Sequence, residues 1–218
     1  MKKLVSNQIS PNFTFSDAIH AALQMWRIGS RKNLNFAEFF GTKNYFLTNA
    51  ARTGLGEIIK IVNPPKEKKI GIPAFICAVV ATPFLEKGYQ IEWIDTDKNG
   101  VIAIEDFVRK AENISMVVVP HVFGQPAPVE EIASIAKQKC IFVIEDCAHL
   151  LPSFEKGTGD EKFSADVRIL SFGREKVLSC VSGGAVLWTE SSPYAEKFQS
   201  LNLPYPSMLW TLRHIGQP

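Results

Sequence analysis

Lys176 lies in the stretch SFGREKVLSCVSGG, residues 171–184, between an apolar run at 167–170 and the pair Gly183-Gly184. A lysine amine is mostly protonated at neutral pH, because its ordinary pKa is about 10.4. Burial or a nearby cation frees the amine as a nucleophile that can form an imine. The alternative is an ordinary surface lysine in a loop. Ser171, just after the apolar run, adds a hydroxyl that can bind phosphate.

Two other stretches carry groups of the same kind. Glu145 and Asp146 follow the apolar run at 141–144. A carboxylate at the end of a buried strand is costly unless it is paired, so it is either a cap or salt-bridge partner or a partner for a cationic ligand group. The small residues of NAARTGLGEII, residues 49–59, begin a helix whose backbone N–H groups can hold an anion, although this stretch taken alone favours an ordinary strand-to-helix turn.

The elements that position these groups alternate along the chain. Runs such as MVVV and IFVI are apolar on both faces, which is typical of parallel strands covered by helices on both sides. The pattern predicts an α/β fold with a mostly parallel sheet flanked by helices, in which ligands bind beyond the carboxyl ends of the strands. The predicted strands are 45–48, 69–73, 89–95, 115–120, 141–146, 167–172 and 184–189, and the predicted helices are 16–28, 33–41, 53–62, 75–88, 104–112 and 128–140.

An anion cradle, a carboxylate and a lysine therefore each follow a different strand. Pyridoxal phosphate needs this set of groups: donors for its phosphate, a lysine for its aldehyde, and an acid that keeps its pyridine nitrogen protonated. Charges about 4 Å apart interact by up to about 4 kcal/mol at an effective dielectric constant of 20, which is enough to hold a pyridinium protonated.

Composition narrows the class of protein. The 218 residues are 46% hydrophobic and 21% charged, and the formal net charge is +2, which argues against binding driven by nucleic-acid phosphates. No apolar run reaches membrane-spanning length and the polar start lacks a signal-peptide core, so we expect a cytoplasmic protein that binds neither nucleic acid nor membrane. The four cysteines form no CxxC pair and predict no metal site; Cys147 and Cys180 are interpreted as core residues.

Three stretches resemble one known family, the DegT/DnrJ/EryC1/StrS aminotransferases, which are fold-type I pyridoxal-phosphate enzymes acting mostly on nucleotide-linked keto sugars. The most specific is PHVFGQPAPVEEIASIAKQKCIFVIEDCAHLLPSF, residues 120–154. The second is SFGREKVLSCVSGGAV, residues 171–186, and a weaker third is FAEFFGTKNYFLTNAARTGL, residues 36–55. The resemblance covers roughly residues 30 to 200.

The resemblance implies roles at the reacting end of the cofactor. Lys176 would form the internal aldimine and, once freed, act as the base in transamination. Asp146 would pair with the pyridine nitrogen, and His149 would lie near the ring hydroxyl. Relatives that dehydrate sugars have histidine in place of this lysine, so Lys176 favours transamination. His121 is interpreted as a structural histidine.

The resemblance also implies a phosphate site and a ring contact. Ser171 would bind phosphate together with the backbone N–H groups of Arg52 and Thr53. Cys77 falls where the family has an aromatic residue stacked on the ring, and Phe75 is a nearby substitute. Val181-Ser182 stands where the family has Gly-Glu.

The predicted organisation is an N-terminal helical segment at 1–30 and a cofactor-binding large domain at 31–218, with the family's C-terminal small domain absent or truncated. The predicted function is a pyridoxal-phosphate aminotransferase that acts on a keto-sugar nucleotide in polysaccharide or surface-glycan biosynthesis. By resemblance, its amino donor is glutamate and it forms a homodimer. The alternatives are a catalytically weak cofactor-binding or regulatory protein and an inactive fragment of such an enzyme.

Overall fold

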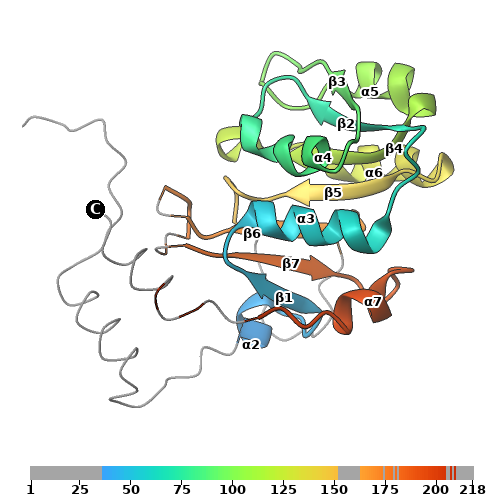
Figure 1. Ribbon diagram of the computed structural model, residues 1–218. Helices are drawn as coiled ribbons and strands as arrows, with labels where there is room; N and C mark the ends of the chain where they lie inside the picture. Colours follow the sequence, from blue (N-terminus) through green and yellow to red (C-terminus); the bar gives the residue numbers. More distant parts are fainter. Residues whose placement is uncertain are drawn as a thin grey trace, which may run out of the picture.

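A computed structural model describes residues 36–151, 163–173, 175–178, 180, 182–204, 207 and 209. These residues form one seven-stranded sheet with helices on both faces (Figure 1). The fold class predicted from the sequence is confirmed. The predicted helix at 16–28 and the predicted N-terminal segment 1–30 lie outside the described residues. Every helix in the described part of the chain is too short or too polar to cross a membrane.

The strands follow the apolar runs closely. They are β1 (Tyr45–Thr48), β2 (Lys69–Pro73), β3 (Ile91–Ile94), β4 (Ile114–Pro120), β5 (Phe142–Asp146), β6 (Val167–Ser171) and β7 (Gly184–Trp188). The helices are α2 (Phe36–Phe40), α3 (Ala51–Val62), α4 (Thr82–Glu86), α5 (Ile104–Lys110), α6 (Val129–Gln138) and α7 (Ala195–Gln199). Single 3₁₀ turns occupy Ala78–Val80, Ala111–Asn113 and Val122–Gly124.

The strand order is β1-β7-β6-β5-β4-β2-β3. Strands β3, β2, β4, β5 and β6 are mutually parallel, whereas β7 is antiparallel to both of its neighbours, β6 and β1. The carboxyl ends of β4, β5, β6 and β1 therefore meet the amino end of β7 at one edge of the sheet. The residues singled out from the sequence follow these ends.

Apolar side chains cover both faces of the sheet in three clusters, the smallest of which packs α2 against β6 and β7. One face packs against α3, α4 and α7, where Ile58, Phe84 and Phe198 are buried against the strands. The other face packs against α5 and α6 through Phe107 and Ile132. Burial on both sides explains why β4 and β5 are apolar throughout their central positions.

The helix predicted at 75–88 is wrong in its extent. The segment contains a 3₁₀ turn at Ala78–Val80 and the short helix α4, which has Pro83 in its first turn. Proline has no N–H to continue an earlier helix, so it favours the start of a new one. Helix α7 was not predicted.

Gly184, the first residue of β7, allows α3 to approach the sheet. A Cβ built on Gly184 would lie 2.7 Å from the backbone nitrogen of Ala51 and 2.9 Å from both the carbonyl carbon of Ala50 and the carbonyl oxygen of Leu170. These are backbone atoms, which cannot swing aside. Gly184 therefore sets how closely the amino end of α3 lies against β6 and β7.

We expect Gly184→Ala to lower the free energy of unfolding by about 1–3 kcal/mol, the usual cost of overpacking. The matched control is Gly56→Ala, which lies within α3 and has no atom within 4 Å of the added Cβ. It should raise stability by about 0.5–1 kcal/mol, because alanine favours a helix interior. Urea unfolding of both variants measures the difference, and equal effects would contradict the close-approach argument.

Candidate active site

A cavity of about 670 Å³ opens at the carboxyl ends of the parallel strands. Its wall brings together groups from four segments that are far apart in the sequence. The residues predicted from the sequence that line it are Arg52, Cys77, Asp146, His149, Ser171 and Lys176. Thr53 is not among the lining residues. The edge of the sheet predicted to carry chemistry is therefore the edge that carries the cavity.

Lys176 lies on the loop that joins β6 to β7. The backbone of Phe172 closes the base of this loop: its N–H donates to Gly183 at 2.9 Å, and its carbonyl accepts from Cys180 at 2.9 Å. The backbone N–H of Lys176 donates to the carbonyl of Gly173 at 3.0 Å. The side chain reaches into the cavity, where Nζ lies 3.0 Å from Nε2 of His149.

Asp146 is the buried acid of the cavity. Its Oδ1 accepts the backbone N–H of Ala148 at 2.9 Å, and among the described residues no donor contacts Oδ2. Burial raises the pKa of Asp146, although the bond from Ala148 and the charges of Lys176 and His149 oppose this shift. A buried carboxyl oxygen without a partner is suited to bind a ligand cation that brings its own N–H.

The amino end of α3 forms the anion-binding part of the wall. Ala50, at the N-cap, provides no side-chain cap, and Arg52 and the hydroxyl of Ser171 lie at the same cavity. Within the described residues neither of these two side chains has a hydrogen-bond or ion-pair partner. A helix amino end with a guanidinium and a free hydroxyl favours a bound anion.

Both donor groups of Thr53 form hydrogen bonds to nearby residues of its own segment. Its backbone N–H donates to the carbonyl of Ala50 at 3.0 Å, and its hydroxyl donates to Oδ1 of Asn49 at 2.6 Å. This turn occupies the Thr53 N–H, one of the predicted phosphate donors, while Arg52 and Ser171 remain at the cavity wall. Ser182 stands where the family has the glutamate of Gly-Glu. It lines the cavity and donates its hydroxyl hydrogen to the carbonyl of Asn49.

Cys77 is exposed at the cavity wall, and aromatic rings lie beside it. Phe75 is 53% exposed and lies 6.1 Å from the ring of Phe123, which is 82% exposed. Phe123 in turn stacks on His149 with centroids 5.7 Å apart and planes inclined by 8°. Sequence reasoning missed Phe123, because HVFG reads as a turn and only the structure shows its ring facing the cavity.

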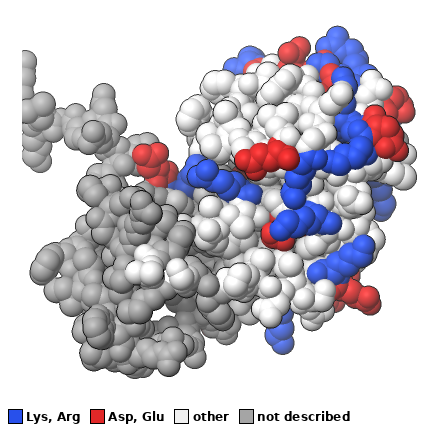
Figure 2. Space-filling model, in the orientation of Figure 1, with Lys and Arg blue, Asp and Glu red and all other residues white. Residues whose placement is uncertain are grey.

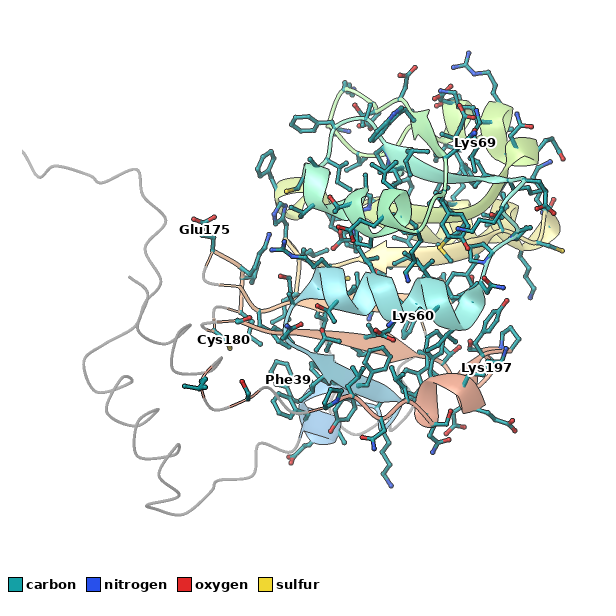
Figure 3. All side chains as sticks on the ribbon, in the orientation of Figure 1. Phe39, Lys60, Lys69, Glu175, Cys180 and Lys197 are labelled. Carbon is teal, nitrogen blue, oxygen red and sulfur yellow. The ribbon has the colours of Figure 1, made fainter. Side chains whose placement is uncertain are left out.

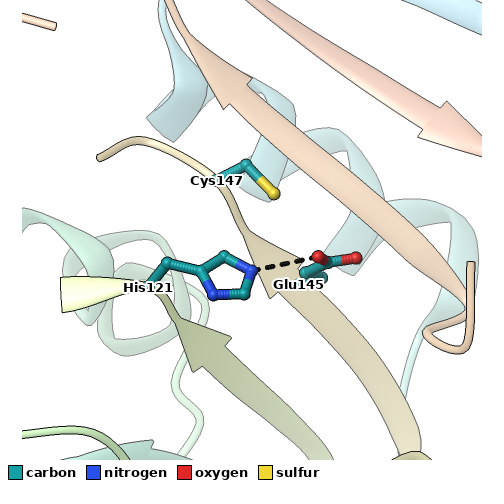
Figure 4. Close-up of side chains that lie close together, drawn as sticks. All are labelled: His121, Glu145 and Cys147. Atoms are coloured by element: carbon teal, nitrogen blue, oxygen red, sulfur yellow. Dashed lines mark hydrogen bonds and ion pairs between the residues drawn. The ribbon is translucent and has the colours of Figure 1, made fainter. Parts of the chain in front are cut away.

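A buried ionic cluster lies beneath the cavity. Glu145 accepts from Nε of Arg168 at 2.8 Å and contacts Nε2 of His121 at 3.0 Å, as Figure 4 shows for the histidine. The other ring nitrogen of His121, Nδ1, accepts the backbone N–H of Ala127 at 2.9 Å. Burial works to raise the pKa of Glu145, but the bond from His121 and the charge of Arg168 outweigh it and hold the pKa below its ordinary value.

Cys147 completes a trio with His121 and Glu145 that has the types and closeness of metal ligands (Figure 4). Both nitrogens of His121 and both oxygens of Glu145 already have partners. Burial and the nearby Glu145 raise the pKa of the Cys147 thiol, so it remains protonated. A metal would have to displace Arg168, and the trio is explained as part of the ionic cluster.

Cys147 is buried, as expected, but the expectation for Cys180 is wrong because that residue is exposed. Figure 3 shows Cys180 and Glu175 on the loop beyond the ends of β6 and β7. The apolar neighbours of Cys180 in the sequence predicted a core position. The loop, however, leaves the sheet after Phe172, the last buried side chain before it.

Residues 16–205 match the DegT/DnrJ/EryC1/StrS aminotransferase family. The chain belongs to this family. The resemblance seen in the sequence is thereby confirmed over most of the chain.

Two curated relatives show how far the likeness extends. The GDP-perosamine synthase of Escherichia coli O157:H7 is 30% identical over 104 residues, which are 47% of this chain and 28% of the relative. The dTDP-4-dehydro-2,6-dideoxy-D-glucose 3-dehydratase of Saccharopolyspora spinosa is 26% identical over 203 residues, covering 84% of this chain and 42% of the relative. The chain thus spans less than half the length of either relative.

Solved structures share the fold. An aminotransferase from Psychrobacter cryohalolentis superposes with a TM-score of 0.71 at 18% identity, covering 87% of this chain and 51% of that chain. A Streptococcus pneumoniae protein solved in a PLP-form gives a TM-score of 0.71 at 15% identity, with 87% and 56% covered. It has also been solved in a PMP-form.

We expect Asp146→Asn to stabilise the cofactor-free protein by about 1–3 kcal/mol at pH 7, because it removes a buried, partly unsatisfied carboxylate. The folded-state pKa is raised, so the wild type loses stability as pH rises from the ordinary aspartate pKa towards the raised one. The advantage of the variant should therefore disappear near pH 3, where both side chains are neutral. Thermal unfolding at pH 3 and pH 7 measures it, and an advantage that is equal at both values would contradict the argument.

Glu145→Gln should lower the free energy of unfolding by about 3–5 kcal/mol at pH 7, since it removes the charge that Arg168 and His121 contact in the buried cluster. The pKa of Glu145 is held low, so the wild-type stabilisation is present above about pH 4.3 and is lost as pH falls through the lower folded-state pKa. The control Glu57→Gln breaks a surface pair with Lys60 and should cost less than about 1 kcal/mol. Equal costs in urea unfolding would show that the buried cluster does not stabilise the sheet.

Proposed function

We propose that the protein is a pyridoxal-phosphate-dependent aminotransferase that acts on a nucleotide-linked keto sugar. The observation that supports this most directly is the meeting, in one cavity, of a lysine amine, a buried carboxyl oxygen that has no partner among the described residues, and an anion-binding helix end. These three groups come from the β6–β7 loop, β5 and α3. Membership of the aminotransferase family points the same way.

The residues fit the cofactor group by group. Asp146 would accept the N–H of the protonated pyridine ring at its free oxygen. Arg52, Ser171 and the amino end of α3 would hold the phosphate. Nζ of Lys176 would form the imine with the aldehyde, and Phe75, Phe123 and the Cys77 side chain would contact the ring or the substrate from the mouth of the cavity.

Pyridoxal phosphate, when bound, supplies an electron sink for the carbanion that forms at the substrate carbon. Asp146 would keep the sink effective by holding the ring nitrogen protonated. Lys176, displaced by the incoming amine, would lie within reach of the substrate Cα and move its proton as general base and acid. A lysine, rather than a histidine, at position 176 favours transamination over sugar dehydration.

The substrate and its setting are inferred from relatives. A GDP-sugar enzyme and a dTDP-sugar enzyme are both similar to this chain, which supports a keto-sugar nucleotide as acceptor. We propose glutamate as the amino donor and a role in glycan biosynthesis from the family resemblance alone. We place the reaction in the cytoplasm and expect a homodimer. On the face shown in Figure 2, lysine and arginine lie interspersed with aspartate and glutamate, which does not favour a nucleic-acid partner.

Addition of pyridoxal phosphate to the purified protein should produce a visible absorbance band that borohydride abolishes. Mass spectrometry should then locate the reduced adduct on Lys176, and Lys176→Ala should lack both the band and the adduct. Asp146→Asn should still form the adduct on Lys176. It should bind the cofactor at least about tenfold more weakly, the loss expected for one charge-assisted hydrogen bond. Glutamate should convert the visible band to that of the aminated cofactor.

Three outcomes distinguish the proposed enzyme from its alternatives. A folded protein that forms no adduct on Lys176 would exclude the proposed function. An adduct without conversion by glutamate would favour a cofactor-binding protein with little catalytic activity. Conversion by glutamate, followed by return of the band with a keto-sugar nucleotide, would support the full reaction.

A further inference from the structure

His149 and Lys176 form a pair within the cavity. Nε2 of the imidazole lies 3.0 Å from Nζ of the lysine, and both residues are partly buried. At this distance one nitrogen donates a hydrogen and the other accepts it. The direction of this bond determines whether the amine is neutral, because an ammonium group has no lone pair and can only donate.

The other ring nitrogen shows which direction holds. The backbone N–H of Phe123 donates to Nδ1 of His149 at 3.3 Å. A backbone N–H cannot accept, so Nδ1 carries no hydrogen and the neutral ring carries its hydrogen on Nε2. An ammonium at Lys176 would then place two donors against each other at 3.0 Å. The neutral amine, with its lone pair towards Nε2–H, is the form that satisfies both contacts.

The loop around Phe123 is shaped to make this contact. Phe123 has φ 51° and ψ 30°, a left-handed conformation that is uncommon for a non-glycine residue. Its ring stacks on His149, which keeps the imidazole plane in place. His121 anchors the far end of the same loop by accepting the N–H of Ala127. Strain at Phe123 is thus maintained by contacts on both sides.

The charges near His149 agree with a neutral ring. Burial, the largest cause, lowers its pKa and Asp146 opposes this; a charged Lys176 would lower the pKa further, so the ring does not need that charge to be neutral. The other titratable side chains that line the cavity are His121 beyond β4, Arg52 on α3, Cys77 beyond β2 and Glu175 on the lysine loop. None of these four has a recorded hydrogen bond to the imidazole.

We propose that His149, with its tautomer fixed by the backbone of Phe123, donates Nε2–H to the lone pair of Nζ and thereby favours the neutral amine of Lys176 over the ammonium form before the cofactor arrives. His149 is then a positioning residue for imine formation, and this role rests on the proposed function of Lys176. Imine formation joins Nζ to the aldehyde carbon. The two hydrogens of the amine leave with the carbonyl oxygen as water, so no oxidant or reductant is required.

The tautomer is tested in the cofactor-free protein by ¹⁵N NMR of the His149 side chain at pH 7. The expected result is a protonated Nε2 and an unprotonated Nδ1. A ring protonated on Nδ1 alone, or on both nitrogens, would overturn the inference. This measurement does not depend on whether the protein binds pyridoxal phosphate.

The consequence is tested by the rate of imine formation with pyridoxal phosphate, using borohydride trapping at Lys176. His149→Leu should slow the reaction about tenfold at pH 7, the factor associated with one hydrogen bond. Near pH 10.5, where about half of solvated lysine amines are neutral, the difference should fall to about twofold or less. His149→Gln, whose amide can accept from Phe123 and donate to Lys176, should recover most of the rate at pH 7.

The two pH values distinguish a proton-holding role from a structural one. Equal slowing of His149→Leu at pH 7 and pH 10.5 would show a distorted site and overturn the inference, as would an unchanged rate at pH 7. Absence of a trapped adduct in the wild type at either pH would overturn the proposed function, while the NMR result would still decide the state of His149.

Discussion

The buried carboxylate of Glu145 joins three neighbouring strands where they end at the cavity. His121 follows β4, Glu145 belongs to β5 and Arg168 belongs to β6, so a single side chain links all three. Successive residues of a strand point to opposite faces, which places the neighbouring Asp146 towards the cavity on the other side. A buried ion pair gives little net stability against an apolar substitute but makes the loss of one partner costly. The cluster therefore stabilises the strand register that places Asp146 at the cavity.

Stability and chemistry oppose each other at Asp146. Its Oδ1 has a protein donor, its Oδ2 has none among the described residues, and burial raises its pKa. An apolar or amide side chain would suit the fold better at this position. The carboxyl group is retained at a cost, which is the pattern expected where a ligand, and not the protein, supplies the missing partner.

The sequence predicted the strands and the convergence of the site well, for a physical reason. Apolar runs without alternation indicate strands that are covered on both faces. Strand β2 was predicted at its observed bounds, 69–73. Parallel ends must meet at one edge, so Asp146, Ser171 and Lys176 had to lie near one another.

What could not be predicted depends on contacts between distant segments. The left-handed turn at Phe123 and the bond from its N–H to His149 join residues that are 26 positions apart. The exposure of Cys180 likewise follows from how the β6–β7 loop leaves the sheet. The turn that occupies the N–H of Thr53 is local, but only the structure shows that it closes onto Ala50.

The reversed direction of β7 has a consequence for how this site can change over time. Because β6 and β7 run antiparallel, the segment between them leaves and re-enters the sheet at the same edge, whereas a parallel neighbour would need a crossover of about a dozen residues or more. Phe172 and Gly183 pair at the base of that segment, so insertions or substitutions beyond them can change the cavity wall while the strands stay in register. The lysine on this loop can thus be shifted or replaced without a change in the sheet. Proteins with this fold can therefore differ in their chemistry through differences in this loop.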